Sequence, residues 1–526
     1  MSRRGLPALV LVVLGLIGLV IVGRDVPERP APFFAATGGT WMPAVGASGS
    51  LTGSWYCPGV PTDGGEGVGG EVVVSNGEAA QVVGRYQILT EDGVLADEQF
   101  TVGSWSQTRI DVDAVSDADF ASVIVEVEGG TGFVEQVARH PLGDSVAACS
   151  NDTSPTWYVA DGFTRENSVE TLVLMNPFDE SVVADLRFST QNRQSEPDRF
   201  RGFIVPPRSV QTIPIAELGA RDEPIIAVTV EATAGRLVVG RAQEYRGGGR
   251  FGYDVSLGAP ELRDQWWFAD GEVADGIEET YSIYNPTDEE VEVTVFFGGL
   301  PLSASAVNEG DPIIVPPLRV VVFDPTGQST TDGSSDDAGG DEGAADDEPA
   351  ETSPADEGDE GDDGFVDFAE PSRDLPDGRH ATVFSTLAQP SIVVDRVLTR
   401  PTDGSISTSV VMGAPPRPDG FVANTWRMAV GPTEPTEQAL VVYNIDQVEA
   451  MVTVSVIGPD GPSVVPSLSD IALASGSIIT IDLVDPDVFG RELIVTSTSR
   501  VFVERLLPRN NDLPGRSGSW LLPVSG

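Results

Sequence analysis

Apolar and polar residues alternate with a period of two along many short stretches of this chain. In residues 291–295 three valines alternate with Glu292 and Thr294, and residues 452–456 repeat the pattern. Such alternation is typical of strands with one buried and one solvated face. The 58 Gly and 40 Pro separate these stretches and favour short strands joined by turns. We therefore expect an all-β chain of antiparallel strands.

One turn recurs along the chain. In LVLMNPFDESVVADLRF (172–188) an Asn-Pro lies between two apolar runs, and a tryptophan precedes it. In such a turn the Asn side chain can bond the backbone two residues on, while Pro presets the second turn position. The corresponding tryptophan–asparagine pairs are Trp55–Asn76, Trp157–Asn176, Trp266–Asn285 and Trp426–Asn444, with spacings of 21, 19, 19 and 18 residues.

The segments around these pairs are alike in their second halves as well. Each continues with a turn and another strand, and closes with two β-rich runs such as IAVTVEATAGRLVVGRA. Four units of about 100 residues predict four tandem antiparallel, immunoglobulin-like β-sandwiches. The expected boundaries are a cytoplasmic N-terminus at 1–4, a transmembrane anchor at 5–23, a linker at 24–51, and sandwiches at 52–150, 151–262, 263–416 and 417–526, the third carrying a disordered acidic insertion at 328–379.

The expected anchor, GLPALVLVVLGLIGLVIVG, is an uninterrupted apolar stretch of 19 residues. This is close to the length a helix needs to cross a bilayer. Arg3 and Arg4 precede it, which predicts a cytoplasmic N-terminus and an extracytoplasmic remainder. The alternative is a cleaved signal peptide, although no Ala-x-Ala follows closely. We expect a single-pass protein of the cell membrane.

The only two cysteines, Cys57 and Cys149, lie in the part expected to be exported. Oxidising conditions there favour a disulfide, and two buried free thiols are the alternative. The two histidines, His140 and His380, belong to different units, so the chain offers few side chains that could together bind zinc. His380 follows Arg379 beside a strand start, where we expect a surface residue.

Charge excludes one class of partner. The chain has 81 Asp and Glu against 31 basic residues, all of them arginine, and a formal net charge of -50. Such a field repels a phosphate backbone, so we expect no nucleic-acid partner. From 332 to 370 there are 17 acidic residues and no basic one, which indicates a solvated loop within the third unit.

Part of this acidic tract, DEGDDGFVDFAE (359–370), nearly matches the twelve-residue calcium loop. The candidate ligands are Asp359, Asp363, Asp367 and Glu370. Position 3 is Gly361, which offers no side-chain oxygen, and Pro371 interrupts any exiting helix. Calcium therefore stays an alternative to a loop that binds no ion, and we expect no other cofactor.

The recurring tryptophans Trp55, Trp157, Trp266 and Trp426 offer a second alternative, because exposed aromatic faces can stack on sugar rings. A tryptophan at the same place in every sandwich is more often part of the core. The neighbouring Ala-Asp-Gly at 160–162 and 269–271 indicates turn chemistry.

Paired carboxylates for glycoside hydrolysis need a defined separation that sequence does not reveal. No Gly-x-Ser-x-Gly or phosphate-loop sequence occurs.

At the Asn-Pro turn, the Pro-Pro or Ser-Gly turn that follows it and the closing Val-x-x-Arg strand, the sequence resembles an actinobacterial domain-of-unknown-function family of membrane-anchored, exported β-sandwich repeat proteins. The resemblance covers nearly all of residues 52–526. It implies a location and a fold, but no catalytic or binding residues.

Together these features predict an uncharacterised membrane-anchored, extracytoplasmic protein without enzymatic activity, serving as a cell-envelope scaffold or interaction protein. One alternative is a carbohydrate or cell-wall-polymer binding protein, and another is an envelope hydrolase with an unrecognised site. The expected partners are the membrane, through the N-terminal helix, and envelope proteins or cell-wall polysaccharide.

Overall fold

The structure is a computed structural model, and antiparallel β-sheet dominates it. The described residues are 43–45, 52–62, 67–116, 118–128, 132–218, 220–301, 308, 310–326, 373, 375–387, 389–415, 423–431, 438–510 and 513–524. Helical elements among them are 3-10 turns of three or four residues: η1 (Arg165–Asn167), η2 (Asp198–Phe200), η3 (Ile215–Leu218), η5 (Pro466–Leu468) and η6 (Pro486–Val488). The all-β prediction is confirmed.

Two predicted segments lie outside the described residues. The anchor at 5–23 is one of them, and within the part that is described no helix has the length and apolarity to cross a membrane. The acidic insertion is the other, since the description stops at 326 and resumes at 373. The calcium-loop candidates Asp359, Asp363, Asp367 and Glu370 therefore also lie outside it.

The described strands form eight sheets, two from each of four consecutive parts of the chain, which we call units 1 to 4. Unit 1 comprises β1 (Thr52–Pro61), β2 (Gly69–Asn76), β3 (Val82–Thr90), β4 (Gly93–Val102), β5 (Ser106–Asp111), β6 (Phe120–Glu128), β7 (Gly132–Arg139) and β8 (Ser145–Ala148). Unit 2 comprises β9 (Thr156–Val159), β10 (Val169–Asn176), β11 (Val182–Ser189), β12 (Gln194–Ser195), β13 (Phe203–Val205), β14 (Ser209–Pro214), β15 (Ala227–Ala234), β16 (Val238–Tyr245) and β17 (Gly252–Leu257).

Units 3 and 4 repeat this organisation. Unit 3 comprises β18 (Gln265–Val273), β19 (Glu278–Asn285), β20 (Val291–Gly298), β21 (Ile313–Val315), β22 (Arg319–Phe323), β23 (Gly378–Ser385), β24 (Val393–Thr402) and β25 (Ser405–Met412). Unit 4 comprises β26 (Thr425–Met428), β27 (Ala439–Asn444), β28 (Ala450–Gly458), β29 (Gly461–Val464), β30 (Ile471–Leu473), β31 (Ile478–Asp482), β32 (Leu493–Ser497), β33 (Val501–Pro508), β34 (Arg516–Trp520) and β35 (Leu522–Pro523).

One sheet of each unit, which we call the central sheet, has the same strand order throughout. The four orders are β5-β2-β7-β8, β14-β10-β16-β17, β22-β19-β24-β25 and β31-β27-β33-β34. The other sheet, the peripheral sheet, contains the strand that carries the repeat tryptophan: β1, β9, β18 or β26. Each unit is therefore sandwich-like, with two antiparallel sheets packed face to face.

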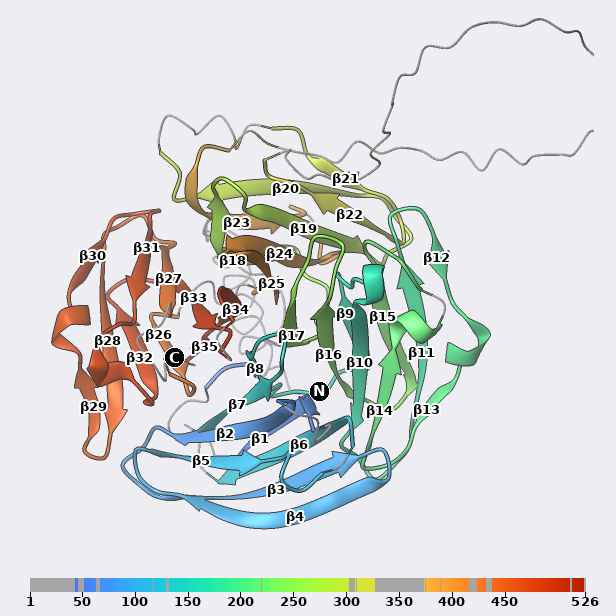
Figure 1. Ribbon diagram of the computed structural model, residues 1–526, viewed down its shortest axis with the longest axis horizontal. Coiled ribbons are helices and arrows are strands. Elements are labelled where there is room, and N and C mark those ends of the chain that lie inside the picture. Colours follow the sequence, from blue (N-terminus) through green and yellow to red (C-terminus); the bar gives the residue numbers. More distant parts are fainter. Residues whose placement is uncertain are drawn as a thin grey trace, which may run out of the picture.

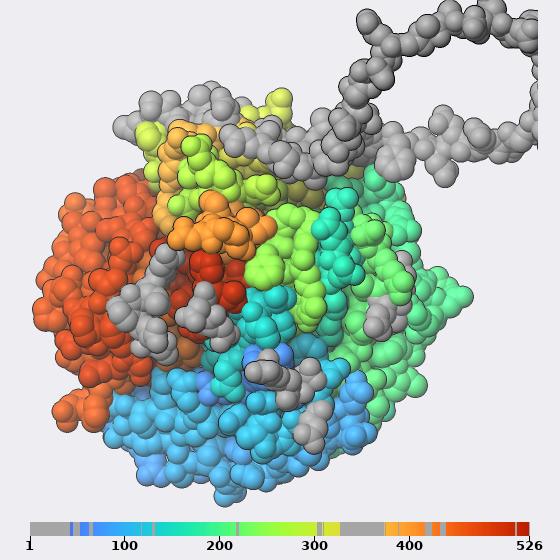
Figure 2. Space-filling model, viewed as in Figure 1, coloured from blue at the N-terminus to red at the C-terminus, as the bar shows by residue number. Residues whose placement is uncertain are grey.

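The four units surround a common centre (Figures 1 and 2). The last strands of the central sheets, β8, β17, β25 and β34, lie side by side there. Unit 4 lies against unit 1, so the units form a closed ring. The segment before unit 1 reinforces the closure, because the N–H of Val45 donates to the carbonyl of Pro523 at 3.0 Å.

The ring explains why the central sheets are apolar on both faces. Strand β10 has seven buried residues of eight, without the alternation of a half-exposed strand. One face of such a sheet packs on the peripheral sheet of its own unit and the other contacts a neighbouring unit. Strand β20 keeps the alternation that its sequence predicts, with its glutamate exposed and its second and third valines buried. Burial on both faces is thus confined to the strands between units.

The predicted disulfide between Cys57 and Cys149 is confirmed. The two sulfur atoms are 2.00 Å apart and both cysteines are fully buried. The bond joins β1 to the residue after β8, where the chain leaves unit 1 for unit 2. It therefore ties the peripheral sheet of unit 1 to the strand at the centre of the ring.

Candidate functional site: the buried charges between the units

The four tryptophans considered for ligand stacking lie in the cores of the units. Trp55, Trp157, Trp266 and Trp426 have exposed fractions of 1%, 1%, 0% and 3%. The indole N–H groups of the last three donate to backbone carbonyls at 2.9, 2.9 and 3.0 Å. Their ring faces are thus covered by protein, as in the core arrangement, and offer no surface to a sugar in this structure.

The turn asparagines Asn76, Asn176, Asn285 and Asn444 are fully buried and share one hydrogen-bonding pattern. The side-chain oxygen of Asn176 accepts the N–H of Phe178 at 3.0 Å, which is the turn bond that the sequence predicts. Its amide nitrogen donates to the carbonyls of Glu180, Val205 and Pro206 at 2.8, 3.2 and 2.9 Å. These side chains therefore fix turns and are not available to a ligand.

The prediction that His380 is a surface residue is wrong, because it is 0% exposed. Its Nε2 lies 3.4 Å from Oε2 of Glu279, and its ring meets Phe297 edge-on at 5.5 Å. Gly271 on the paired strand leaves room for the imidazole, since a side chain there would collide with it. Nowhere in the described residues do three or more His, Cys, Asp or Glu side chains gather closely enough to hold a metal ion.

Sequence reasoning missed a set of buried ion pairs that join successive units. An arginine of each of units 2, 3 and 4 contacts a carboxylate of the next unit around the ring. The pairs are Arg241–Asp395 between units 2 and 3 at 3.1 Å, Arg396–Glu504 between units 3 and 4 at 2.9 Å, and Arg505–Glu135 between units 4 and 1 at 2.8 Å. We call these side chains the junction arginines and junction carboxylates. None is more than 3% exposed.

The junction carboxylates also accept backbone N–H groups from the preceding unit. Asp395 accepts those of Ala160 and Asp161 at 3.3 and 3.0 Å. The equivalent bonds run from Ala269 to Glu504 at 2.8 Å, and from Ala429 and Val430 to Glu135 at 2.9 and 3.0 Å. The prediction that Ala-Asp-Gly 269–271 forms a turn is wrong, because these residues lie within β18, where the pairing with β23 is irregular. The segments 160–162 and 269–271 instead supply N–H donors to the carboxylate of the next unit.

The junction between units 1 and 2 has no junction arginine, no junction carboxylate and no backbone N–H donor at the equivalent positions. Gln136 occupies the position of the junction arginine, opposite Ala147 as Arg241 is opposite Ser256. In unit 2, Gly240 occupies the position of the junction carboxylate, directly before Arg241. In unit 1, Pro58 occupies the position of the alanine that donates its N–H in the other units, and proline has no N–H. A Cβ atom on Gly240 would lie 2.8 Å from Cγ of Pro58, so close backbone packing replaces the ion pair.

Burial and ion pairing shift the pKa values of two junction carboxylates in opposite directions. Burial raises the pKa values of Asp395 and Glu504, and the junction arginine beside each of them offsets part of that effect. Burial alone would lower the pKa of Arg396, but Glu504 and Asp270 outweigh it and hold the pKa above its ordinary value. Each junction carboxylate thus has an arginine beside it and accepts at least one backbone N–H, which is how buried carboxylates are stabilised in proteins.

A second carboxylate supports the junction between units 3 and 4. Asp270 lies 2.9 Å from Nη2 of Arg400 and 3.9 Å from Nη2 of Arg396, and it also pairs with Arg379. Burial raises the pKa of Asp270, but these arginines outweigh it and leave the pKa below its ordinary value. Asp161 has the equivalent place in unit 2, where its Oδ1 accepts the hydroxyl of Ser282 from unit 3 at 2.8 Å.

Glu170 differs from the other buried acids because neither of its carboxyl oxygens has a hydrogen-bond partner in the described structure. It is fully buried and packs against Gly162, where any side chain would collide with it. Burial raises the pKa of Glu170 to about 8, and the nearby Arg241 only partly offsets this. The carboxyl group is therefore mostly protonated at neutral pH.

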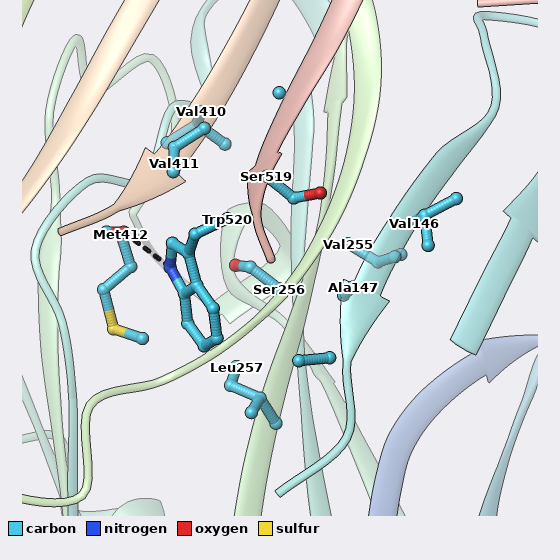
Figure 3. Close-up of a pocket in the computed structure, with 12 residues that line it drawn as sticks. Val146, Ala147, Val255, Ser256, Leu257, Val410, Val411, Met412, Ser519 and Trp520 are labelled. Atoms are coloured by element: carbon cyan, nitrogen blue, oxygen red, sulfur yellow. Dashed lines mark hydrogen bonds between the residues drawn. The ribbon is translucent and has the colours of Figure 1, made fainter. Parts of the chain in front are cut away.

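A small cavity lies at the centre of the ring (Figure 3). Its volume is about 30 Å³, and each of the four central strands contributes three residues to its wall. Trp520 closes one side, with its indole N–H donating to the carbonyl of Met412 at 3.1 Å. A space of this size holds one or two water molecules and no substrate.

A larger hollow of about 220 Å³ lies on unit 2 beside β11 and β12. Its wall includes the apolar side chains of Phe188, Ile215 and Ile226. Arg193 and Glu223 pair with each other within the lining. Unlike the junction charges, which are buried between units, the charged groups of this hollow form an ion pair at the surface of one unit.

Comparisons with known proteins do not assign this chain to a family. No protein-family model matches it, and no curated protein matches it either. Among solved structures, one titled Thermotoga maritima 1070 shares 17% identity over 21% of this chain and 97% of its own, with a TM-score of 0.18. A tetra-tandem repeat from the extending region of a large adhesion protein shares 11% identity over 86% of this chain and 94% of its own, with a TM-score of 0.08. Likenesses at these TM-scores carry no argument about this chain.

Proposed function

We propose that this chain is a membrane-tethered, extracytoplasmic protein that acts without catalysis, as a scaffold or interaction protein of the cell envelope. In this proposal four tandem immunoglobulin-like sandwiches form a ring outside the membrane, and the resemblance to a family of membrane-anchored, exported β-sandwich repeat proteins supports that location. The apolar stretch at 5–23 supplies the tether. The buried disulfide between Cys57 and Cys149 supports exposure of the ring to an oxidising compartment.

One observation carries the absence of catalysis in this proposal. The junction carboxylates are among the residues that a hydrolase could use, because they are buried and lie close to other charged groups. Each is engaged by an arginine of the preceding unit and by backbone N–H groups. Their chemistry is thus used to hold units together. The repeat tryptophans are likewise used in cores, so the sugar-binding alternative lacks its aromatic faces.

The first test concerns location. The full-length chain is expressed in its native host with a C-terminal tag, and intact cells are treated with protease. We expect the tag in the membrane fraction and its removal by protease from outside. A tag that stays protected in intact cells, or that appears only in the culture medium as a shortened chain, would contradict the tethered location.

The second test separates an interaction protein from a polymer binder and a hydrolase. Cells that express the full-length chain are cross-linked in vivo, and the cross-linked neighbours are identified by mass spectrometry. Purified protein is then sedimented with protein-free cell-wall polymer. We expect discrete protein neighbours and no sedimentation. Retention by the bare polymer, or its breakdown, would favour one of the other two functions.

A further inference from the structure

The junction between units 4 and 1 differs from the other three in connectivity. Units 1 and 2, units 2 and 3, and units 3 and 4 follow one another directly in the chain. Units 4 and 1 lie at opposite ends of the described sequence, and in the ring they meet through non-covalent contacts. Closure of the ring therefore depends on how well these two surfaces fit.

The fit is extensive. At its centre Arg505 pairs with Glu135 at 2.8 Å. The guanidinium of Arg427 lies 4.9 Å from the centre of the Phe133 ring, which places a cation over an aromatic face. Towards the axis of the ring, the side chain of Asn510 donates to Asp144 at 2.7 Å. Two arginines and an asparagine of unit 4 thus each meet a matching carboxylate or aromatic group of unit 1.

This interface has the head-to-tail geometry of the covalently linked junctions. Arg505 lies on β33 of unit 4, and Glu135 lies on β7, the equivalent strand of unit 1. In the same way Arg241 lies on β16 of unit 2 and Asp395 on β24 of unit 3. Head-to-tail interfaces are not self-limiting, because the surface that closes a ring within one chain can equally join one chain to another. The surface of unit 1 around Glu135 accordingly fits unit 4 of any copy.

We propose that the surface of unit 1 around Glu135 is a docking site for unit 4 of a second copy of this chain, and that the molecule's own unit 4 occupies it in the closed ring. Copies exchange when the ring opens at this junction. The other junctions do not exchange, because the linkers 149–155, 258–264 and 413–424 keep their partners at a high effective concentration. The proposal stands independently of the proposed envelope function.

A charge-swap experiment tests the proposal with full-length chains carrying two different tags. One copy carries Glu135→Arg, and the other carries Arg505→Glu. Neither copy can close on itself, since each would bring two like charges together in a buried site. A mixed pair restores one native junction, Arg505 of the first copy on Glu135 of the second, and one reversed pair. We expect co-expressed copies to be captured together about ten-fold more than either variant with itself.

Two controls fix the interpretation. Copies with Glu504→Arg and Arg396→Glu place the same swap at the junction between units 3 and 4, and there we expect no gain in co-capture. The double variant Glu135→Arg with Arg505→Glu in one chain should return to the behaviour of the unsubstituted protein. Folding is checked by formation of the disulfide and by resistance to protease.

Equal capture of the mixed and unmixed copies, with both variants folded, overturns the proposal, as does an equal gain at the junction between units 3 and 4. If the charge-swapped chains do not accumulate alone or together, the milder Glu135→Gln and Arg505→Gln copies replace them in the same scheme. Their mixture contains one native Arg505–Glu135 junction. Higher capture in this mixture supports exchange, and equal capture overturns it.

Discussion

At the scale of single residues, polar side chains in this protein are buried where they complete backbone hydrogen bonding. Asn176 and its three counterparts each satisfy one N–H and three carbonyls around a turn. Each such amide uses nearly all of its hydrogen-bonding capacity, so no single replacement reproduces it. Glu170 represents the opposite case, a buried acid whose oxygens have no hydrogen-bond partner in the described structure.

Replacement of a turn asparagine should therefore be costly. We expect Asn285→Ala to lower the free energy of unfolding by about 2–4 kcal/mol, because it leaves buried backbone groups unpaired. Denaturant titration followed by circular dichroism measures the change. Asn192→Ala, at an exposed position in unit 2, is the control and should change little. Equal midpoints for the two variants would show that the turn bonds do not contribute as described.

Glu170 should make stability depend on pH in an unusual direction. Its pKa of about 8 in the folded protein lies above the ordinary value of 4.5, so the folded state binds this proton more tightly than the unfolded chain. Its contribution to stability is complete below pH 4.5 and is lost as the pH rises towards 8. At pH 7 the loss amounts to roughly 3 kcal/mol.

Glu170→Gln removes this titration. We expect the variant to be more stable than the unsubstituted protein at about pH 8, with the difference shrinking towards pH 4.5. Urea midpoints over this pH range measure it. Glu180→Gln, which alters an exposed side chain of the same unit, should show no such trend. A difference for Glu170→Gln that is independent of pH would contradict the raised pKa.

At the scale of strands and sheets, alternation and turn residues in the sequence account for the all-β class, the turn bonds and the half-exposed strand β20. They do not account for the strands between units. In β24 and β33 an acid directly precedes an arginine, Asp395-Arg396 and Glu504-Arg505, and alternation alone would leave one of each pair in solvent. A neighbouring unit buries both, which is a tertiary effect that no local pattern encodes.

A signal for these pairs was nevertheless present in the repeat. The acid and the arginine recur at the same place in the closing strands of units 3 and 4, and unit 1 has Glu135-Gln136 there. Identical charged positions in repeated units indicate contacts between units. The burial of His380 is likewise a tertiary effect that its local sequence does not reveal. It depends on Gly271 of the adjacent strand, which has no side chain and leaves room for the imidazole.

The disulfide belongs to this scale because it connects two elements of unit 1. Its loop spans 92 residues, so replacing Cys57 and Cys149 by serine should lower the free energy of unfolding by about 4 kcal/mol on the chain-entropy model. Thermal unfolding of the double variant and the unsubstituted protein, both without reductant, measures the loss. An unchanged unfolding temperature would mean that unit 1 does not depend on this link.

At the scale of the whole molecule, the four units form a ring whose junctions are alike but not identical. Three carry an ion pair, and the junction between units 1 and 2 has close packing of Pro58 on Gly240 in its place. Arg505 and Glu135 close the ring where the chain itself provides no connection. This ion pair lies at the centre of the interface that closes the ring, together with the cation–π contact of Arg427 and the hydrogen bond of Asn510.

A double-mutant cycle on Arg505 and Glu135 tests that closure most directly. The free energy of unfolding is measured for the full-length protein, Arg505→Met, Glu135→Gln and the double variant. The exposed pair of Arg85 and Asp97 serves as the control and should show a much weaker coupling. We expect a coupling of about 1–3 kcal/mol between Arg505 and Glu135. Additive effects of the two substitutions would contradict a ring closed by this pair.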